Sequence, residues 1–197
     1  SGTYVIYGLR ANTSISMSFT GNSNNVGGTV ANSIQLSATG TSSQVIGMHT
    51  SNAQALFTAN TIRNLTTNIG TGTTTSASVI GINVTTTTPN HTLSQNTIYN
   101  LSNTNATAAS VVTGIQFIGN TANVVQRNLI YGLTVATTSA TAEVNGIRVA
   151  GGTTVYRNNM IALGEGIANA IGGPATNSSV SGINGINEAL GTNQFFH

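Results

Sequence analysis

A short phrase recurs along the chain with only part of it kept constant. "NTIRNL", "NTIYNL", "NLIYGL" and "NNMIAL" begin at Asn60, Asn96, Asn128 and Asn158, which are 36, 32 and 30 residues apart. Each copy has an Asn, an apolar residue two positions later and a Leu five positions later, whereas the positions between them vary. Repeats of about this length are typical of solenoid proteins, in which each copy is a structural unit that stacks on the next.

A second phrase, Val-x-Gly-Ile, alternates with the first. An aliphatic residue stands two positions before and one position after its glycine in all six copies, which are centred on Gly8, Gly47, Gly81, Gly114, Gly146 and Gly182. The residues that follow the glycine alternate between apolar and polar, as in "GINV" at 81–84, and this alternation predicts short β-strands. Thr-, Ser-, Gly- and Ala-rich stretches such as 66–78 and 164–179 differ most in length, so we expect variable loops on one side of each repeat.

Strands that recur about every 30 residues, with no helical pattern between them, predict a parallel β-helix. We therefore expect an all-β fold, a right-handed parallel β-helix of five to six coils, in a single domain over residues 1–197. Successive coils would stack about 4.8 Å apart, with like residues above like residues. The aliphatic columns would form the core, and the glycine column would mark a close approach of backbone, where a Cβ would clash.

The asparagine column is expected to be structural. A residue at a tight corner between two strands often needs the left-handed conformation, which Asn tolerates better than other non-glycine residues. Stacked Asn amides can also hydrogen-bond along a column. We therefore predict a ladder of Asn60, Asn96, Asn128 and Asn158, with Asn193 as a further member. The register of residues 11–44 stays open, because both Asn22 and "NSIQL" at Asn32 suit the first phrase.

Composition excludes several classes of function. Only 4% of the residues are charged, against about 25% in an average protein, and the bases form no cluster of the kind that binds phosphates. No apolar run approaches the ~18 residues of a membrane span. His49, His91 and His197 fall at different phases of the repeat, so we expect no metal site. No phosphate-binding or zinc-binding phrase is present, and we expect no cofactor. Neither nucleic acid nor a membrane span is therefore predicted.

The two phrases together resemble the right-handed parallel β-helix repeats of large cell-surface and secreted proteins of the Bacteroidetes group. Those repeats also carry "N-x-I-x-N-L" and "V-x-G-I" separated by Ser-, Thr- and Ala-rich spacers. The resemblance covers nearly the whole chain, and most clearly residues 45–163. It implies export, an extracellular or cell-surface location, and a role in adhesion or surface architecture. The chain begins and ends inside the two phrases, so we expect adjoining coils or further copies of the chain to stack on both ends.

Enzymes with this fold, such as pectate lyases and polygalacturonases, use clustered carboxylates. This chain has no Asp, and its three Glu lie in or beside the variable spacers. We therefore expect a protein that is not an enzyme. A polysaccharide lyase or hydrolase is the weakest of three hypotheses, because it needs two carboxylates within about 10 Å.

The positions expected to face outward are the candidate binding residues. Three positions after each Asn stand Arg63, Tyr99, Tyr131 and Ile161, and one position before it stand Gln95, Arg127 and Arg157. Ring faces and guanidinium groups bind sugars and anionic glycans, so a surface polysaccharide is a candidate ligand of Arg63, Tyr99, Tyr131, Arg127 and Arg157. The alternative is an aromatic ladder that only stabilises a solvent-exposed face.

Arg127 and Arg157 favour the ligand, because like charges on adjacent strands repel one another unless something compensates them. Our first hypothesis is nevertheless a structural or adhesive extracellular segment, such as a stalk, a surface-layer component or a filament subunit. A carbohydrate-binding module is the alternative.

Overall fold

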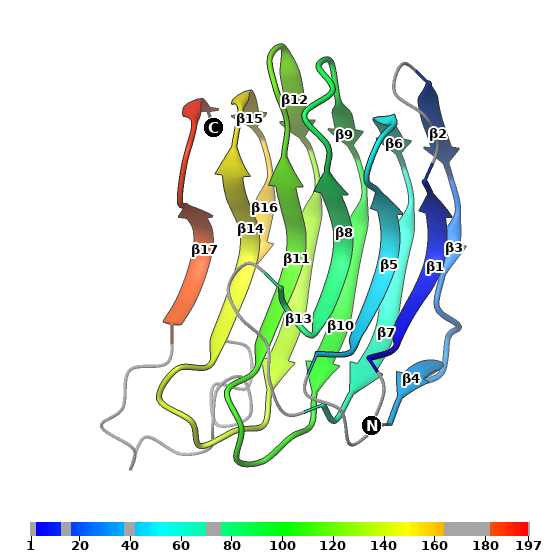
Figure 1. The fold of residues 1–197 in the computed structure, drawn as a ribbon, viewed down its shortest axis with the longest axis vertical. Coiled ribbons are helices and arrows are strands. Elements are labelled where there is room, and N and C mark those ends of the chain that lie inside the picture. The colour runs from blue at the N-terminus through cyan, green and yellow to red at the C-terminus, as the bar shows by residue number, and fades with distance from the viewer. Residues whose placement is uncertain (1–2, 13–16, 38–41, 70–75, 164–181, 197) are drawn as a thin grey trace.

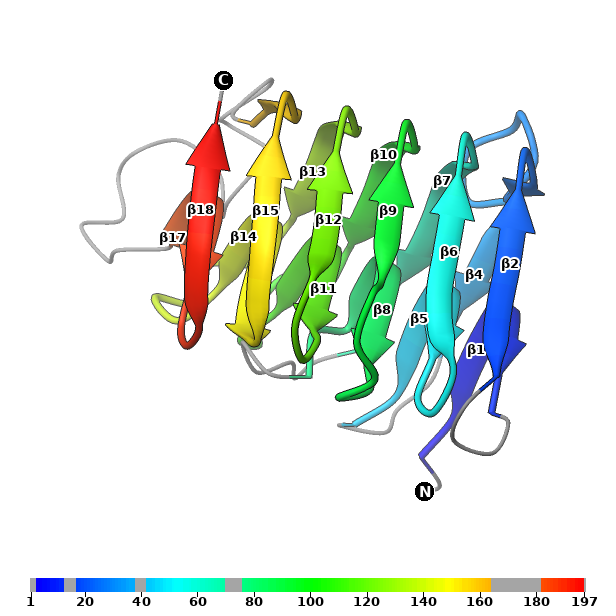
Figure 2. The same ribbon diagram turned by 90° about the horizontal axis from the view of Figure 1, so that it is seen from above.

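The computed structural model describes residues 3–12, 17–37, 42–69, 76–163 and 182–196. Its strands form three six-stranded sheets in which every pairing is parallel, and no helix occurs among these residues. The sheets wind into a β-solenoid, as Figures 1 and 2 show. The predicted all-β parallel β-helix is therefore confirmed.

Each turn of the solenoid passes through the three sheets in the same order. Sheet A carries the Val-x-Gly-Ile phrase and contains β1 (Val5–Ala11), β5 (Gln44–Thr50), β8 (Val79–Thr85), β11 (Val111–Ile118), β14 (Glu143–Gly151) and β17 (Gly182–Glu188). Sheet B contains β2 (Ser18–Asn22), β6 (Gln54–Thr58), β9 (Thr92–Ser94), β12 (Asn123–Gln126), β15 (Thr153–Arg157) and β18 (Thr192–Phe196). Sheet C contains β3 (Asn25–Val26), β4 (Ile34–Leu36), β7 (Thr61–Thr67), β10 (Thr97–Asn103), β13 (Leu129–Val135) and β16 (Met160–Ala162).

Four turns are regular, with one strand in each sheet, and this is fewer than the five to six coils expected. These turns are β5–β7, β8–β10, β11–β13 and β14–β16. The first turn has its third strand split into β3 and β4, which both pair with β7, and the last turn is described over β17 and β18.

The split strand settles the register that the sequence left open. Val26 of β3 pairs with Ile62, and Ile34 of β4 pairs with Leu65, while residues 27–33 leave the sheet between them. Neither Asn22 nor Asn32 therefore occupies the ladder position. Asn24 does, because it directly precedes β3 and donates its amide hydrogen to Asn60 Oδ1 at 2.9 Å.

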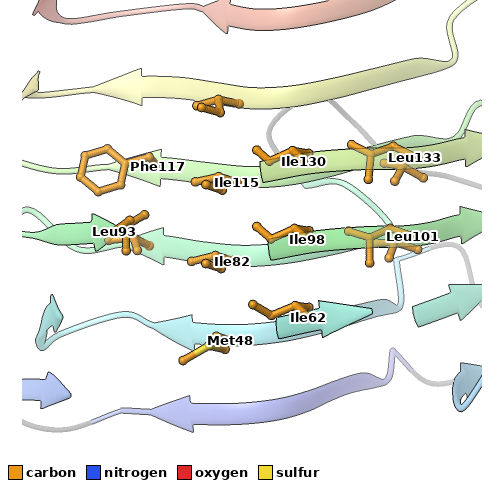
Figure 3. Packing of buried hydrophobic residues seen from close by; sticks show 14 of the residues in the cluster. Met48, Ile62, Ile82, Leu93, Ile98, Leu101, Ile115, Phe117, Ile130 and Leu133 are labelled. Carbon is orange, nitrogen blue, oxygen red and sulfur yellow. The ribbon is translucent and has the colours of Figure 1, made fainter. Parts of the chain in front are cut away.

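The core is a continuous stack of aliphatic side chains inside the three sheets. Ile62, Ile98 and Ile130 lie above one another on sheet C, and Ile82 and Ile115 do so on sheet A (Figure 3). All five are fully buried. Full burial of a side chain of this size contributes about 1.5–3 kcal/mol, so each turn is stabilised mainly by the turns on either side of it.

The glycine column is explained by close packing, as expected. A Cβ on Gly81 would lie 2.5 Å from the Gly114 carbonyl oxygen and 2.6 Å from Ile98 Cγ2. The last copy differs from the prediction, because Gly182 pairs with Glu143 and Ile183 pairs with Val144. Gly185 therefore completes the glycine column, and the assignment of Gly182 was wrong by three residues.

The connections between sheets differ in how constant they are. Every described connection from sheet B to sheet C has two residues, for example 59–60 and 95–96. The two connections from sheet C to sheet A that are described throughout, 104–110 and 136–142, have seven residues each, whereas most of the variable stretches predicted at 66–78 and 164–179 lies outside the described residues. Connections from sheet A to sheet B vary, from 86–91 to Gly152 alone. The constant corner is where the Asn phrase begins.

Candidate functional site

A ladder of asparagine side chains runs along the corner between sheets B and C. Its amides donate from one turn to the next, each at 2.9 Å, through Asn24, Asn60, Asn96, Asn128 and Asn159. Each Oδ1 also accepts the backbone N–H of the preceding Asn, as Asn96 Oδ1 does from Asn60 at 3.1 Å. The second amide hydrogen goes to a backbone carbonyl, such as Phe57 O for Asn96 at 3.0 Å.

The ladder differs from the prediction at its last member. Asn159 accepts from Asn128, whereas Asn158 stands one position earlier with a φ of 52°. The same left-handed conformation occurs in the residue before each ladder Asn, namely Ser23, Ala59, Gln95 and Arg127. The ladder Asn side chains are therefore selected for hydrogen bonding and not, as expected, for the left-handed conformation. Asn193 lies outside this ladder, because it pairs with Thr154 in sheet B.

The outward column on sheet C brings together three of the predicted binding residues. The rings of Tyr99 and Tyr131 stack with centroids 4.9 Å apart and an interplanar angle of 2°. Arg63 Nη1 donates to the Tyr99 hydroxyl at 2.9 Å, and Arg63 Nε donates to Gly27 O at 3.4 Å. Ile161 does not belong to this column, because it pairs with Ile130, and Ala162 pairs with Tyr131 instead.

The other two predicted binding residues do not form a pair in one column. Arg157 pairs with Gln126 and donates to its Oε1 at 2.6 Å. Arg127 occupies the next column, the left-handed position between Gln95 and Asn158. Arg127 and Arg157 therefore stand in neighbouring columns and not opposite one another on adjacent strands, which is the arrangement that the expected repulsion required.

A hollow of about 460 Å³ lies beside the tyrosine stack on the outer face of sheet C. It is lined by Ala31, Asn32, Asn64, Thr66, Asn100, Ser102, Tyr131, Gly132 and Thr134. Only Tyr131 among these was a predicted site residue. Ala31 and Asn32 were missed because they lie on the excursion 27–33, and the remaining residues because the sequence singled out only the positions one before and three after each Asn.

A second hollow, of about 560 Å³, lies at the corner between sheets A and B. It is lined by Met17, Ser51, Asn52, Gln54, residues 85–89 and Asn90. Its lining has neither a charged nor an aromatic side chain. It therefore has fewer of the groups that recognise a specific ligand than the hollow on sheet C.

Two histidines are buried within the fold. The Ala55 backbone N–H donates to His91 Nδ1 at 2.8 Å, and the His91 ring packs edge-on against Phe117. His49 packs against Tyr7 on the outer face of sheet A, 5.2 Å between ring centroids. Burial lowers the pKa of both histidines below the ordinary value of 6.5. Both rings are therefore neutral at pH 7 and serve packing and hydrogen bonding.

The outer face of sheet A carries a polar row that is exposed at Arg10 and buried from His49 to Arg148. Pairing places Arg10, His49, Asn83, Gln116 and Arg148 on successive turns. Arg148 is only 5% exposed, and its Nε and Nη1 have no hydrogen-bond partner among the described residues. Leaving buried polar nitrogens without hydrogen-bond partners costs free energy.

The carboxylates are widely separated where they are described. Glu188 pairs with Val149, which lies six positions along β14 from Glu143. At about 3.3 Å per residue the backbone positions of the two residues are about 20 Å apart, against carboxylates at most about 10 Å apart in glycosidases. Glu165 and His197 lie outside the described residues. Among the described residues no group of three metal-binding side chains occurs.

Comparison with protein-family models, with curated proteins and with solved structures gave no match. Within the part of the chain that is described, no helix has the length and hydrophobicity needed to cross a membrane.

Proposed function

We propose that this chain is a structural and adhesive segment of an extracellular protein, in which stacked turns form a rigid stalk or surface layer. The observation that carries the proposal is the asparagine ladder, which continues through five successive turns without a break. Such a ladder serves rigidity rather than catalysis, because it occupies its own amide groups fully.

The charged side chains support the same proposal. Arg63 bonds to Tyr99 and Gly27, and Arg157 bonds to Gln126, so both guanidinium groups are used to connect turns. Glu143 and Glu188 are too far apart for the paired carboxylates of glycosidases. We therefore propose a protein that is not an enzyme and needs no cofactor. The cell-surface or secreted location, and the Bacteroidetes-type origin, belong to this proposal and are supported by the two repeated phrases.

Adjoining coils or further copies of the chain are the proposed partners. Ile183, Ile186 and Phe195 of the last turn are 42%, 40% and 40% exposed. Their counterparts one turn earlier, Val144, Ile147 and Tyr156, are at most 1% exposed. Apolar side chains in these columns are buried wherever another turn covers them, so a further turn or a second copy fits this surface.

Single-molecule force spectroscopy tests the structural role. The chain is held between two well-characterised marker domains and stretched from its termini. A rigid segment should give abrupt unfolding steps, because each turn is stabilised cooperatively by its neighbours. Smooth extension at low force, as an unstructured linker gives, would contradict a mechanical role.

A further inference from the structure

We propose that the outer face of sheet C holds a binding site for a neutral sugar, in the hollow above Gly132. This goes beyond the structural role, which stands without it. The site is bordered by Tyr131, Asn100 and the hydroxyl groups of Ser102 and Thr134.

One end of the hollow lies where a second, shorter amide ladder stops. Asn64, Asn100 and Gly132 occupy equivalent left-handed positions, with φ of 55°, 53° and 63°. Asn100 Nδ2 donates to Asn64 Oδ1 at 3.2 Å, and Asn64 Nδ2 donates to Gly28 O at 2.7 Å. Gly132 has no side chain with which to continue, and a Cβ there would lie 2.9 Å from Asn100 Oδ1. Asn100 Oδ1 therefore borders the space above Gly132 and accepts no hydrogen bond from the described residues.

The walls of the hollow are polar on one side and aromatic on the other. Thr66, Ser102 and Thr134 stand on successive strands β7, β10 and β13, which lie side by side in Figure 1. Tyr131 forms the opposite wall and is held in place by its stacking on Tyr99. Ala31 and Asn32 close one end. Three strands span about 10 Å, and the volume of about 460 Å³ falls within the range of small-molecule clefts.

The side chains that line the hollow indicate which class of ligand it would bind. Amide and hydroxyl groups can both donate and accept hydrogen bonds, as sugar hydroxyls require, and a tyrosine ring supplies an apolar surface together with a polar hydroxyl. No charged side chain lines the hollow. The nearest predicted cation, Arg63, already bonds to Tyr99 and Gly27. The arrangement therefore fits a neutral sugar, in contrast to the anionic glycan that the arginine columns favoured.

Gly132→Asn tests the site by filling it, and its Cβ, 2.9 Å from Asn100 Oδ1, requires only the end of the Asn100 side chain to shift. The left-handed position tolerates Asn, as Asn64 and Asn100 show, and the new side chain would extend the amide ladder into the hollow. Binding is measured by titration calorimetry on the whole chain with neutral oligosaccharides of glucose, mannose, galactose and xylose, and with oligogalacturonate as an acidic probe. Thr87→Asn, at the second hollow, is the matched control, and circular dichroism confirms that both variants are folded.

We expect at least one neutral oligosaccharide to bind, with affinity reduced tenfold or more in Gly132→Asn and unchanged in Thr87→Asn. Three outcomes would overturn the proposal: no neutral probe binds, Gly132→Asn binds as well as the unsubstituted chain, or only oligogalacturonate binds. None of these outcomes bears on the force measurement, so failure of the sugar site and failure of the structural role are distinguishable.

Discussion

The ladder residue Asn96 shows how single side chains hold neighbouring turns together. It is fully buried, donates to Asn128 Oδ1 and Phe57 O, and accepts from the backbone and side-chain nitrogens of Asn60. A hydrogen bond is worth about 1 kcal/mol when it forms, but leaving its buried partner unsatisfied costs about 1–3 kcal/mol. The ladder is therefore more sensitive to substitution than its polar composition suggests.

Replacing Asn96 by Leu should lower the free energy of unfolding by about 4 kcal/mol, because several buried partners lose their bonds at once. Urea denaturation followed by circular dichroism measures the change. Gln95→Asn is the matched control, since Gln95 is exposed and left-handed, and we expect it to change stability by less than about 0.5 kcal/mol. If both substitutions changed the free energy of unfolding equally, the ladder hydrogen bonds would contribute no more to stability than an exposed side chain does.

The buried histidines give the fold a pH dependence. Burial lowers the pKa of His49 and His91 below 6.5 in the folded chain, so the unfolded chain takes up protons first as the pH falls. The free energy of unfolding should therefore be constant above about pH 7.5 and decrease below 6.5, by up to about 1.4 kcal/mol per pH unit for each histidine. The decrease stops once the pH passes the lowered folded pKa values.

Denaturation curves between pH 5 and 8 measure this slope, and few other groups interfere, since the chain has no Asp and three Glu. His91→Asn keeps an acceptor for the Ala55 N–H and should make the slope shallower. A free energy of unfolding that is the same at both ends of this range would contradict the assignment of neutral, buried rings.

At the scale of the strand, the glycine column sets how closely sheets A and C approach. A Cβ on any of Gly47, Gly81, Gly114 and Gly146 would lie 2.5–2.6 Å from the carbonyl oxygen of the next glycine, and an Ile of sheet C fills the remaining space. A methyl group in this column cannot be accommodated by rotating a side chain, because the carbonyl oxygen belongs to the backbone. The spacing of the strands therefore depends on glycine wherever another turn lies above.

Gly81→Ala should destabilise the chain by about 1–3 kcal/mol, the usual cost of overpacking a core. Gly185→Ala is the matched control in the same column, because no atom lies within 4 Å of the position that its Cβ would take. The control should be neutral or slightly stabilising, since alanine lowers the entropy of the unfolded chain. Thermal unfolding measures both, and equal melting temperatures would refute close packing as the reason for the glycine column.

The sequence predicts which residues stack on one another in successive turns wherever a repeated phrase can be aligned in only one register. The fold, the glycine column from Gly8 to Gly146 and the Arg63–Tyr99–Tyr131 column follow from the repeats alone. Two registers were equally good at "NNM", where Asn158 and Asn159 are adjacent, and at "GINGIN", where the phrase overlaps itself. The hollow on sheet C could not be predicted as a whole, because Ala31 and Asn32 close one end of it from an excursion that no other described turn has.

At the scale of the molecule, the last turn differs from those it resembles. β17 and β18 carry apolar side chains that are buried in the preceding turns but exposed here, and each is the last strand of its sheet among the described residues (Figure 2). Edge strands of this kind pair with other strands. We therefore expect the chain to associate with copies of itself as concentration rises.

Sedimentation equilibrium over a range of concentrations measures this association. Ile186→Lys should weaken it tenfold or more, because a charge replaces an apolar side chain that a stacked turn would bury. Thr107→Lys places the same charge on an exposed loop of a middle turn and should leave the association unchanged. A chain that is monomeric at every concentration would contradict the stacking proposal.

Immunogold labelling of intact cells tests the proposed extracellular structural role most directly. Antibodies raised against the folded chain are applied to intact and to permeabilised cells that make the protein. If the chain is a structural segment of the cell surface, gold particles should decorate intact cells as densely as permeabilised ones. Labelling that appears only after permeabilisation, in the cytoplasm, would contradict it.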